Sequence, residues 1–124
     1  MKSYKDLDVY NLSLTLFYKT HKASLKLPHY ELYELGSQLR RSSDSVVTNI
    51  VEGYGRKKYK QDFIKFLTYS HASNLETQCH LEKLQFLYTD LSVELEALKV
   101  EYDLLGAKLF SFLRYVENNW NKFE

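Results

Sequence analysis

The stretch "LSVELEALKVEYDLLGAKLFSFLRYV", from Leu91 to Val116, decides the fold class. Apolar residues recur in it every three or four positions without a proline, which is the spacing that places side chains along one side of an α-helix. These residues are Leu91, Leu95, Leu98, Tyr102, Leu105, Leu109, Phe112 and Val116. Because such a stripe must be covered by neighbouring elements, the stretch predicts a helix inside a bundle.

The remaining helices follow from the few residues that break the pattern. Pro28 is the only proline and predicts a break at 27–31, while two of the four glycines predict another at 53–58. A third break is expected near Tyr88, where Asp90 or Ser92 can cap a new helix. We therefore expect helices at about 7–26, 32–53, 59–88 and 92–119. At 124 residues the chain has the usual size of one domain, so residues 1–124 are predicted to form one all-α, antiparallel up-down four-helix bundle.

Two of these helices carry more apolar surface than one bundle needs. Besides its core stripe, the first helix has a second set of large side chains: Tyr10, Leu14, Phe17, His21 and Leu25. The fourth has a flanking set: Val93, Val100, Leu104 and Tyr115. Large aromatic side chains could simply widen the core stripe. We instead expect these faces to be buried against other copies, which predicts a closed homo-oligomer with the first and fourth helices supplying much of the contact.

The second and third helices have small, polar residues at the centre of their predicted core stripes. In an antiparallel hairpin these residues come level with one another: Ser42 and Asn49 with Ser70, Asn74 and Thr77. Buried polar groups need hydrogen-bond partners, and Arg40, Arg41, Glu52 and Glu76 are near enough in sequence to supply some. Two interpretations stay open, a polar pocket or close helix packing in a fixed register.

Net charge and cysteine content limit the kinds of partner and of cellular compartment that fit this sequence. The formal net charge is +1, but residues 1–65 hold 12 Lys and Arg against 7 Asp and Glu, whereas residues 66–124 hold 5 against 9. This argues against a protein that coats nucleic acid, yet it leaves room for a local basic surface. No apolar run approaches a membrane span, the first residues do not resemble a secretory signal, and Cys79 is the only cysteine. The expected location is the cytoplasm, without membrane association.

We find no signature of catalysis or of metal binding. The sequence lacks Glu-x-x-His, His-Glu-x-x-His and Cys-x-x-Cys patterns. Cys79 and His80, with Glu76 one turn earlier, come nearest to a metal site, but consecutive residues of a helix point about 100° apart. The histidines at 21, 29 and 71 have no evident carboxylate partner. The sequence therefore predicts no catalytic residues, no metal, no cofactor and no enzyme.

A candidate binding site lies in "NIVEGYGRKKYKQDF", Asn49 to Phe63. Gly53 and Gly55 are expected to end the second helix in the left-handed conformation that glycine adopts readily. The candidate nucleic-acid-binding residues around them are Arg56, Lys57, Lys58, Lys60, Tyr54 and Tyr59. Basic residues interleaved with aromatic ones are typical of phosphate contacts with stacking platforms. The alternative is a solvated turn whose charges favour the end of the preceding helix.

The segment "YELGSQLRRSSDSVVTNIVEGYGRKKYKQDFIKFLTYSHASNLETQ", Tyr33 to Gln78, resembles a known family. These are the four-helix bundle proteins encoded in intervening sequences of bacterial large-subunit ribosomal RNA genes. The resemblance extends to nearly the whole chain, and its most telling parts are Gln38–Arg41, Asn49–Arg56, Asp62–Leu67 and Leu75–Gln78. It implies a ring-like homopentamer without established enzymatic activity. It also implies a relation to the accessory subunits of diversity-generating retroelements, which work with a reverse transcriptase and nucleic acid.

Two functions are open on these grounds. The first is a non-enzymatic, oligomeric assembly or interaction protein whose partner is itself, as a pentamer, or another protein. The second is an accessory factor that binds RNA, DNA or a nucleic-acid-processing protein through the basic loop between the second and third helices.

Overall fold

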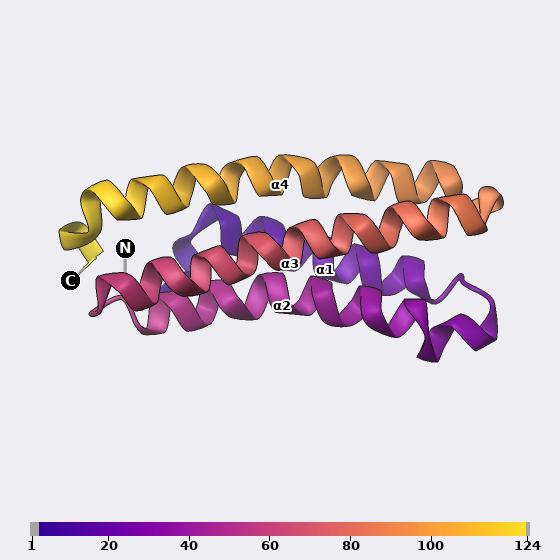
Figure 1. Ribbon diagram of the computed structural model, residues 1–124, viewed down its shortest axis with the longest axis horizontal. Helices are drawn as coiled ribbons and strands as arrows, with labels where there is room; N and C mark the ends of the chain where they lie inside the picture. The colour runs from indigo at the N-terminus through magenta and orange to yellow at the C-terminus, as the bar shows by residue number, and fades with distance from the viewer. Residues whose placement is uncertain (1–2, 124) are drawn as a thin grey trace.

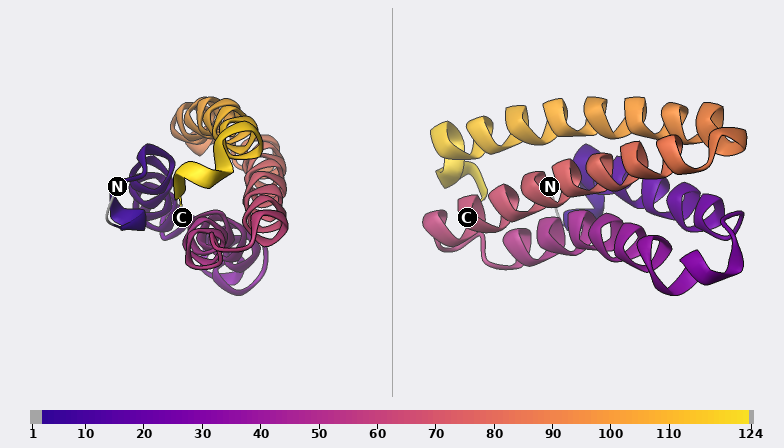
Figure 2. Two further views of the ribbon diagram at one scale, coloured as in Figure 1. Left: turned by 90° about the vertical axis from the view of Figure 1, so that its left-hand side faces the viewer. Right: turned by 45° about the vertical axis from the view of Figure 1, so that its right-hand side comes forward.

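A computed structural model describes residues 3–123 as four long helices in up-down order (Figure 1). They are α1 (Asp8–Ser24), α2 (Leu35–Gly55), α3 (Lys60–Leu87) and α4 (Ser92–Asn119). Viewed along the bundle, each helix lies beside its neighbours in chain order, and α4 returns next to α1 (Figure 2). The predicted all-α, up-down four-helix fold is confirmed, and the helix bounds differ from the predicted ones by at most three residues.

The largest difference lies between α1 and α2. Residues His29–Tyr33 form a short 3₁₀ helix, so α2 begins at Leu35 instead of 32. This connection is packed tightly, because a Cβ on Gly36 would lie 2.5 Å from the carbonyl oxygen of Glu31. Arg40 holds the same turn by donating to the Ser24 hydroxyl, at 3.0 Å, and to the Leu32 carbonyl. Side-chain contacts between distant residues therefore set the start of α2.

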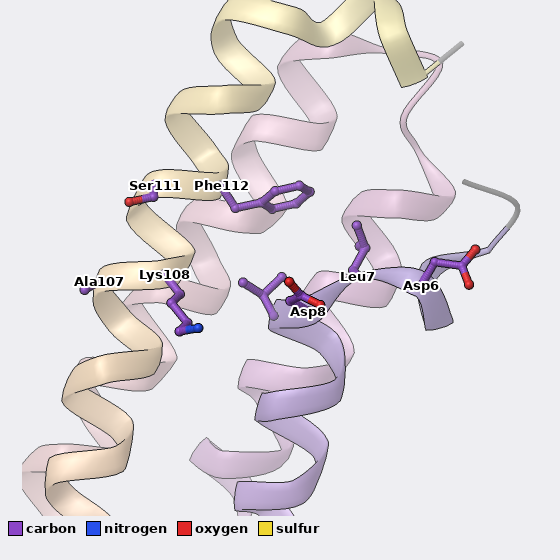
Figure 3. A pocket seen from close by; sticks show the side chains of 8 residues that line it. Asp6, Leu7, Asp8, Ala107, Lys108, Ser111 and Phe112 are labelled. Carbon is purple, nitrogen blue, oxygen red and sulfur yellow. The ribbon is translucent and has the colours of Figure 1, made fainter.

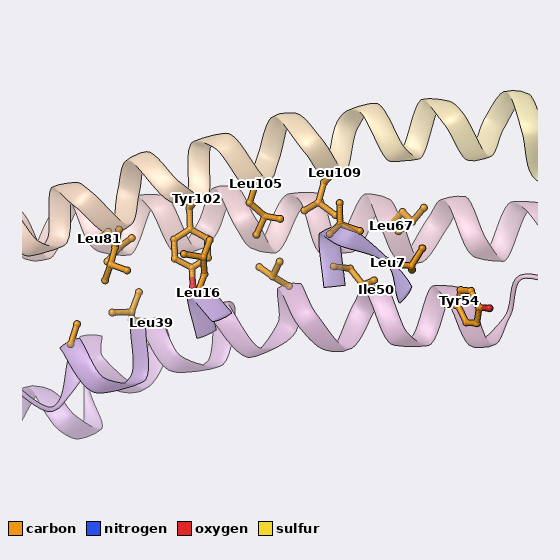
Figure 4. Close-up of a cluster of buried hydrophobic side chains, with 14 of the residues drawn as sticks. Leu7, Leu16, Leu39, Ile50, Tyr54, Leu67, Leu81, Tyr102, Leu105 and Leu109 are labelled. Atoms are coloured by element: carbon orange, nitrogen blue, oxygen red, sulfur yellow. The ribbon is translucent and has the colours of Figure 1, made fainter. Parts of the chain in front are cut away.

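The core runs the length of the bundle and is filled by side chains from all four helices (Figure 4). Among its fully buried members are Leu16, Leu39, Phe63, Leu67, Leu81, Leu84, Tyr102, Leu105 and Leu109. The hydroxyl of Tyr102 lies 2.7 Å from that of Thr20, which also donates to the Leu16 carbonyl. Burial raises the pKa of Tyr102 to about 12, partly offset by its hydroxyl hydrogen bonds.

Hydroxyl groups join α2 to α3 across the predicted polar centre. Thr77 donates to Ser42 at 2.8 Å, Ser70 donates to the Val46 carbonyl at 2.7 Å, and the Ser45 and Ser73 hydroxyls lie 2.8 Å apart. These short bonds favour the interpretation of close packing in a fixed register over that of a pocket.

The other polar residues near this centre bond elsewhere. Asn49 donates to Ser45 within α2, and Asn74 accepts from Gln78 within α3. Arg40 contacts the α1–α2 turn, Glu52 pairs with Arg56, and Glu76 pairs with His80. Most of these bonds lie within one helix or at the α1–α2 turn, but the Ser45 hydroxyl that Asn49 contacts is the one that meets Ser73, so Asn49 supports the α2–α3 contact.

The extra apolar faces of α1 and α4 differ in how far the bundle buries them. In α1, Tyr10 packs against the core and Leu14 and Phe17 are half-buried, while His21 and Leu25 are exposed. In α4 the whole flanking set is exposed: Val93 by 87%, Val100 by 59%, Leu104 by 55% and Tyr115 by 44%. A widened core therefore explains part of the α1 set and none of the α4 set.

The C-terminal segment closes one end of the bundle. After α4, residues Trp120–Phe123 form a 3₁₀ turn that bends inward between the helices (Figure 2). Phe123 is buried, with its ring centroid 5.4 Å from that of Phe63 and 6.0 Å from that of Phe112. The indole N–H of Trp120 donates to the carbonyl of Lys57 at 2.7 Å, so the chain end is tied to the α2–α3 loop.

Candidate nucleic-acid interface

The α2–α3 loop comprises residues 56–59, one residue fewer than the sequence predicts. The expectation that Gly53 and Gly55 end the helix with a left-handed backbone is wrong, since no residue in the described part of the chain has a positive φ. Gly53 lies inside α2, where an added Cβ would be 3.2 Å from the Cβ of Phe66, and Gly55 is the last residue of α2, with open space around it. Gly53 thus lets α2 and α3 approach closely, which is a packing role.

Tyr54 is buried and unavailable for stacking on a base. Its side chain is 8% exposed, and its ring meets those of Phe63 and Tyr4 edge to face. The ammonium group of Lys57 lies 4.3 Å from the centroid of this ring and donates to the Tyr54 hydroxyl at 3.1 Å. Both residues therefore stabilise the end of the bundle.

Arg56 is also engaged within the chain. Its guanidinium group contacts Glu52 at 3.3 Å and Asp62 at 3.5 Å, and it lies 4.9 Å from the ring centroid of Phe66. Two carboxylates offset its single charge, so a phosphate would have to compete with them.

Lys58, Tyr59 and Lys60 are the predicted residues that stay accessible. Tyr59 is 61% exposed, Lys58 is exposed and Lys60 is half-buried. Within the described chain neither lysine has an ion pair. The ammonium group of Lys58 lies 5.8 Å from the Tyr59 ring centroid. The structure thus brings together two available cations and one exposed ring.

The first turns of α3 extend this surface with residues that the sequence analysis missed. Lys65 lies about equally far from two rings, 6.0 Å from that of Phe66 and 5.9 Å from that of Tyr69, which is 45% exposed. Phe66 and Tyr69 lie three residues apart in α3, a spacing that brings their ring centroids within 5.6 Å and that the sequence would have indicated. We call Lys58, Tyr59, Lys60, Lys65 and Tyr69 the basic-aromatic surface.

The candidate metal ligands do not converge. His80 is buried and contacts Glu76 at 3.2 Å through Nε2, whereas the neighbouring Cys79 is exposed. Over residues 3–123 no three His, Cys, Asp or Glu side chains gather closely enough to hold a metal ion.

A surface groove of about 450 Å³ lies between the start of α1 and residues 107–112 of α4 (Figure 3). Asp6, Asp8 and Lys108 line it together with apolar side chains such as Leu7 and Phe112. Ser111 also lines it, and its lining includes neither histidine nor cysteine.

The four long helices, packed in up-down order around one shared core, define a structural class, the all-α four-helix bundle. The model of the 23S rRNA-intervening sequence protein family matches residues 5–111, and the chain belongs to this family. No curated protein matches it. Within residues 3–123, the helices are too short or too polar to cross a membrane.

Proposed function

We propose that the protein is a non-enzymatic assembly module that associates with further copies of itself. The observation that carries this proposal is the outward face of α4, formed by Val93, Ala97, Val100, Leu104 and Ala107, all of them exposed. We call these five residues the outer stripe of α4. They follow the helical repeat on the side opposite Tyr102, Leu105 and Leu109, so the bundle itself cannot bury them.

Self-association would remove this exposed apolar surface from water. Contiguous apolar surface on a monomer is uncommon and typically marks a contact with another protein. The flanks of the stripe remain charged: Glu101 pairs with Lys19 of α1 at 3.1 Å, and Glu94 pairs at 2.9 Å with Lys26, which follows α1. An apolar strip between charged edges is the usual composition of a protein interface. The family resemblance supports a ring-like homopentamer as the assembled form.

Light scattering coupled to gel filtration tests the proposal. At micromolar concentration we expect a mass several times the 14.8 kDa of one chain. The double variant Val100→Glu, Leu104→Glu should reduce the mass to that of a single chain, because buried unpaired carboxylates are costly at an interface.

The matched control places the same two charges on α2, as Gln38→Glu with Thr48→Glu. Both positions are exposed and lie among polar neighbours, so the assembly should survive there. A native protein of single-chain mass would refute the proposal, and so would equal dissociation by both double variants.

A second function, nucleic-acid binding as an accessory factor, is favoured by the basic-aromatic surface. An exposed ring such as Tyr59 contributes about 1–3 kcal/mol when a base stacks on it, and the lysines around it can contact phosphates. Few such contacts exist on one chain, but several copies in a ring would raise the affinity by acting together. The related accessory subunits of diversity-generating retroelements support the same choice of partner.

Titration of labelled single-stranded RNA and DNA at two salt concentrations tests this second function. Lys58→Ala with Lys60→Ala should weaken binding. It should also reduce the slope of log affinity against log salt concentration by the amount expected for about two phosphate contacts. The matched control, Lys22→Ala with Lys26→Ala, removes one lysine in the last turn of α1 and one just after it; this end of α1 lies at the opposite end of the bundle from the α2–α3 loop (Figure 1). Absence of binding at low salt, or an equal loss in both variants, would refute it.

A further inference from the structure

We infer that α3 of one subunit packs against α4 of the next, so that residues at the same level along the bundle face each other. The subunits are then related by a rotation axis parallel to the helices. This inference rests on the proposed self-association and names the two surfaces that meet. It starts from a second exposed face, on α3, which comprises Ala72, Leu75, Cys79 and Phe86. We call these four residues the outer stripe of α3.

The outer stripe of α3 is as exposed as that of α4. Phe86 is 85% exposed and Leu75 is 56% exposed, while Cys79 and Phe86 line an open groove of about 530 Å³. Leu35 and Leu87 complete the apolar part of this groove, and Glu82 and Lys83 form its edge. A subunit thus carries two apolar stripes on neighbouring helices, and both need a cover.

The two stripes are in register with each other. Counting away from the α3–α4 turn in both directions, Phe86 and Val93 lie at equal distances from it. The same holds for three further pairs: Cys79 with Val100, Leu75 with Leu104, and Ala72 with Ala107.

Contacts inside the subunit show that nearly equal distance from the turn means nearly equal level along the bundle, because each contact joins an α3 residue to an α4 residue only two positions farther from the turn, about 3 Å along the axis. Gln85 donates to Glu96 at 2.8 Å near the turn. Farther along, the rings of His71 and Phe110 have centroids 6.4 Å apart. Because α3 and α4 are antiparallel and closely packed, residues of the two stripes that share a level differ only in the direction in which they point.

Rotation about an axis parallel to the helices leaves the level of every residue unchanged. Such an axis, whether it relates two copies or generates a ring, can therefore bring Cys79 of one subunit opposite Val100 of the next. The large Phe86 then meets the smaller Val93 and Leu75 meets Leu104, while the small pair Ala72 and Ala107 lets the two helices approach closely. Pairing α4 with α4 instead would leave Leu75 and Phe86 exposed, and this decides between the two arrangements.

The native Cys79 makes the pairing testable by disulfide trapping. We compare the Val100→Cys variant with native protein after oxidation by diamide, on non-reducing gels. The inference predicts bands at multiples of the chain mass for Val100→Cys and none for the native protein. Its control, Ser111→Cys, places the second thiol about 16 Å farther along the axis, at about 1.5 Å per residue. A disulfide requires Cα atoms within about 7 Å, so this variant should give no such bands.

A third variant, Cys79→Ser with Val100→Cys, tests the competing arrangement. Cross-linking in this variant would show α4 against α4 and overturn the inference. Absence of cross-linked bands from Val100→Cys would also overturn it, provided that light scattering shows an oligomer. Single-chain mass by light scattering would instead refute the proposed self-association itself, so the two failures are distinguishable.

Discussion

The outward faces of α2 and α4 differ completely, although both helices bury one face in the same core. The exposed residues of α2 are Gln38, Arg41, Asp44, Thr48, Glu52 and Gly55. Along α4, in contrast, the side opposite the core carries three large apolar residues that are 55–87% exposed: Val93, Val100 and Leu104. The requirements of the bundle are the same for both helices, so they cannot explain the difference. The difference supports the proposed self-association, in which α2 faces water and α4 faces another copy of the chain.

The largest effect on stability should come from substitutions at two adjacent residues of α4, one on its buried face and one on its exposed face. Leu105 is fully buried and Leu104 is 55% exposed. We expect Leu105→Ala to lower the free energy of unfolding by about 2–5 kcal/mol, because it leaves a cavity in the core. Leu104→Ala should cost less, and only while the protein is associated.

Urea denaturation at two protein concentrations distinguishes these cases. The loss in Leu105→Ala should be the same at both concentrations, whereas the loss in Leu104→Ala should shrink on dilution. A concentration-independent loss in Leu104→Ala would mean that the outer stripe contributes to the fold of the single chain, and the comparison with α2 would then fail.

A second, intermediate effect concerns the inner face of α4 at high pH. Burial raises the pKa of Tyr102 from 10.0 to about 12, so the folded state favours the protonated hydroxyl. Its contribution to stability is therefore complete below pH 10 and declines as the pH rises towards 12, by about 2–3 kcal/mol in total.

Tyr102→Phe should remove this decline, while costing about 0.5–1.5 kcal/mol at neutral pH because one hydrogen bond is lost. Urea unfolding at about pH 9 measures the cost of the substitution, and the difference between about pH 9 and about pH 11 measures about half of the decline. Tyr115→Phe, on the exposed side of α4, is the control and should retain the decline. A Tyr102→Phe protein with the native pH dependence would contradict the assignment.

The smallest effect is expected on the outward face of α2. Thr48→Lys places a cation one turn from both Asp44 and Glu52, and each such helical pair is worth about 0.2–0.5 kcal/mol. We expect a small rise in thermal midpoint that disappears in high salt, with no change in assembled mass. A loss of assembly in this variant would show that α2 also lies at an interface.

Sequence periodicity predicted the helices well because it reports which side of each helix must be buried. It also identified the extra apolar set on α4, since Val93, Val100 and Leu104 recur at helical spacing away from the core stripe. Two features needed the structure. The start of α2 depends on the close approach of Gly36 to Glu31, and the closing C-terminal turn depends on the contact of Trp120 with Lys57.

The candidate site was predicted less well, because it too depends on contacts between residues that are not neighbours in the sequence. The composition of the α2–α3 loop predicted a basic surface, but it could not show that Tyr54 is buried or that Lys57 lies over its ring. The ion pair of Arg56 with Glu52 has the helical spacing of four residues and was readable from the sequence. The pair with Asp62 depends on how the loop folds. Availability of a charged group is thus a property of its neighbours in space.

The short α3–α4 turn has a consequence for how sequences of this kind can vary. Loops commonly accept inserted or deleted residues, because little depends on their length. Here one residue added within Thr89–Leu91 would shift α4 along α3 or rotate it by about 100°, and Val100 would no longer lie level with Cys79. We therefore expect natural variants to conserve the length of this turn more strictly than that of the α1–α2 connection, where no pair of exposed stripes depends on the residue count.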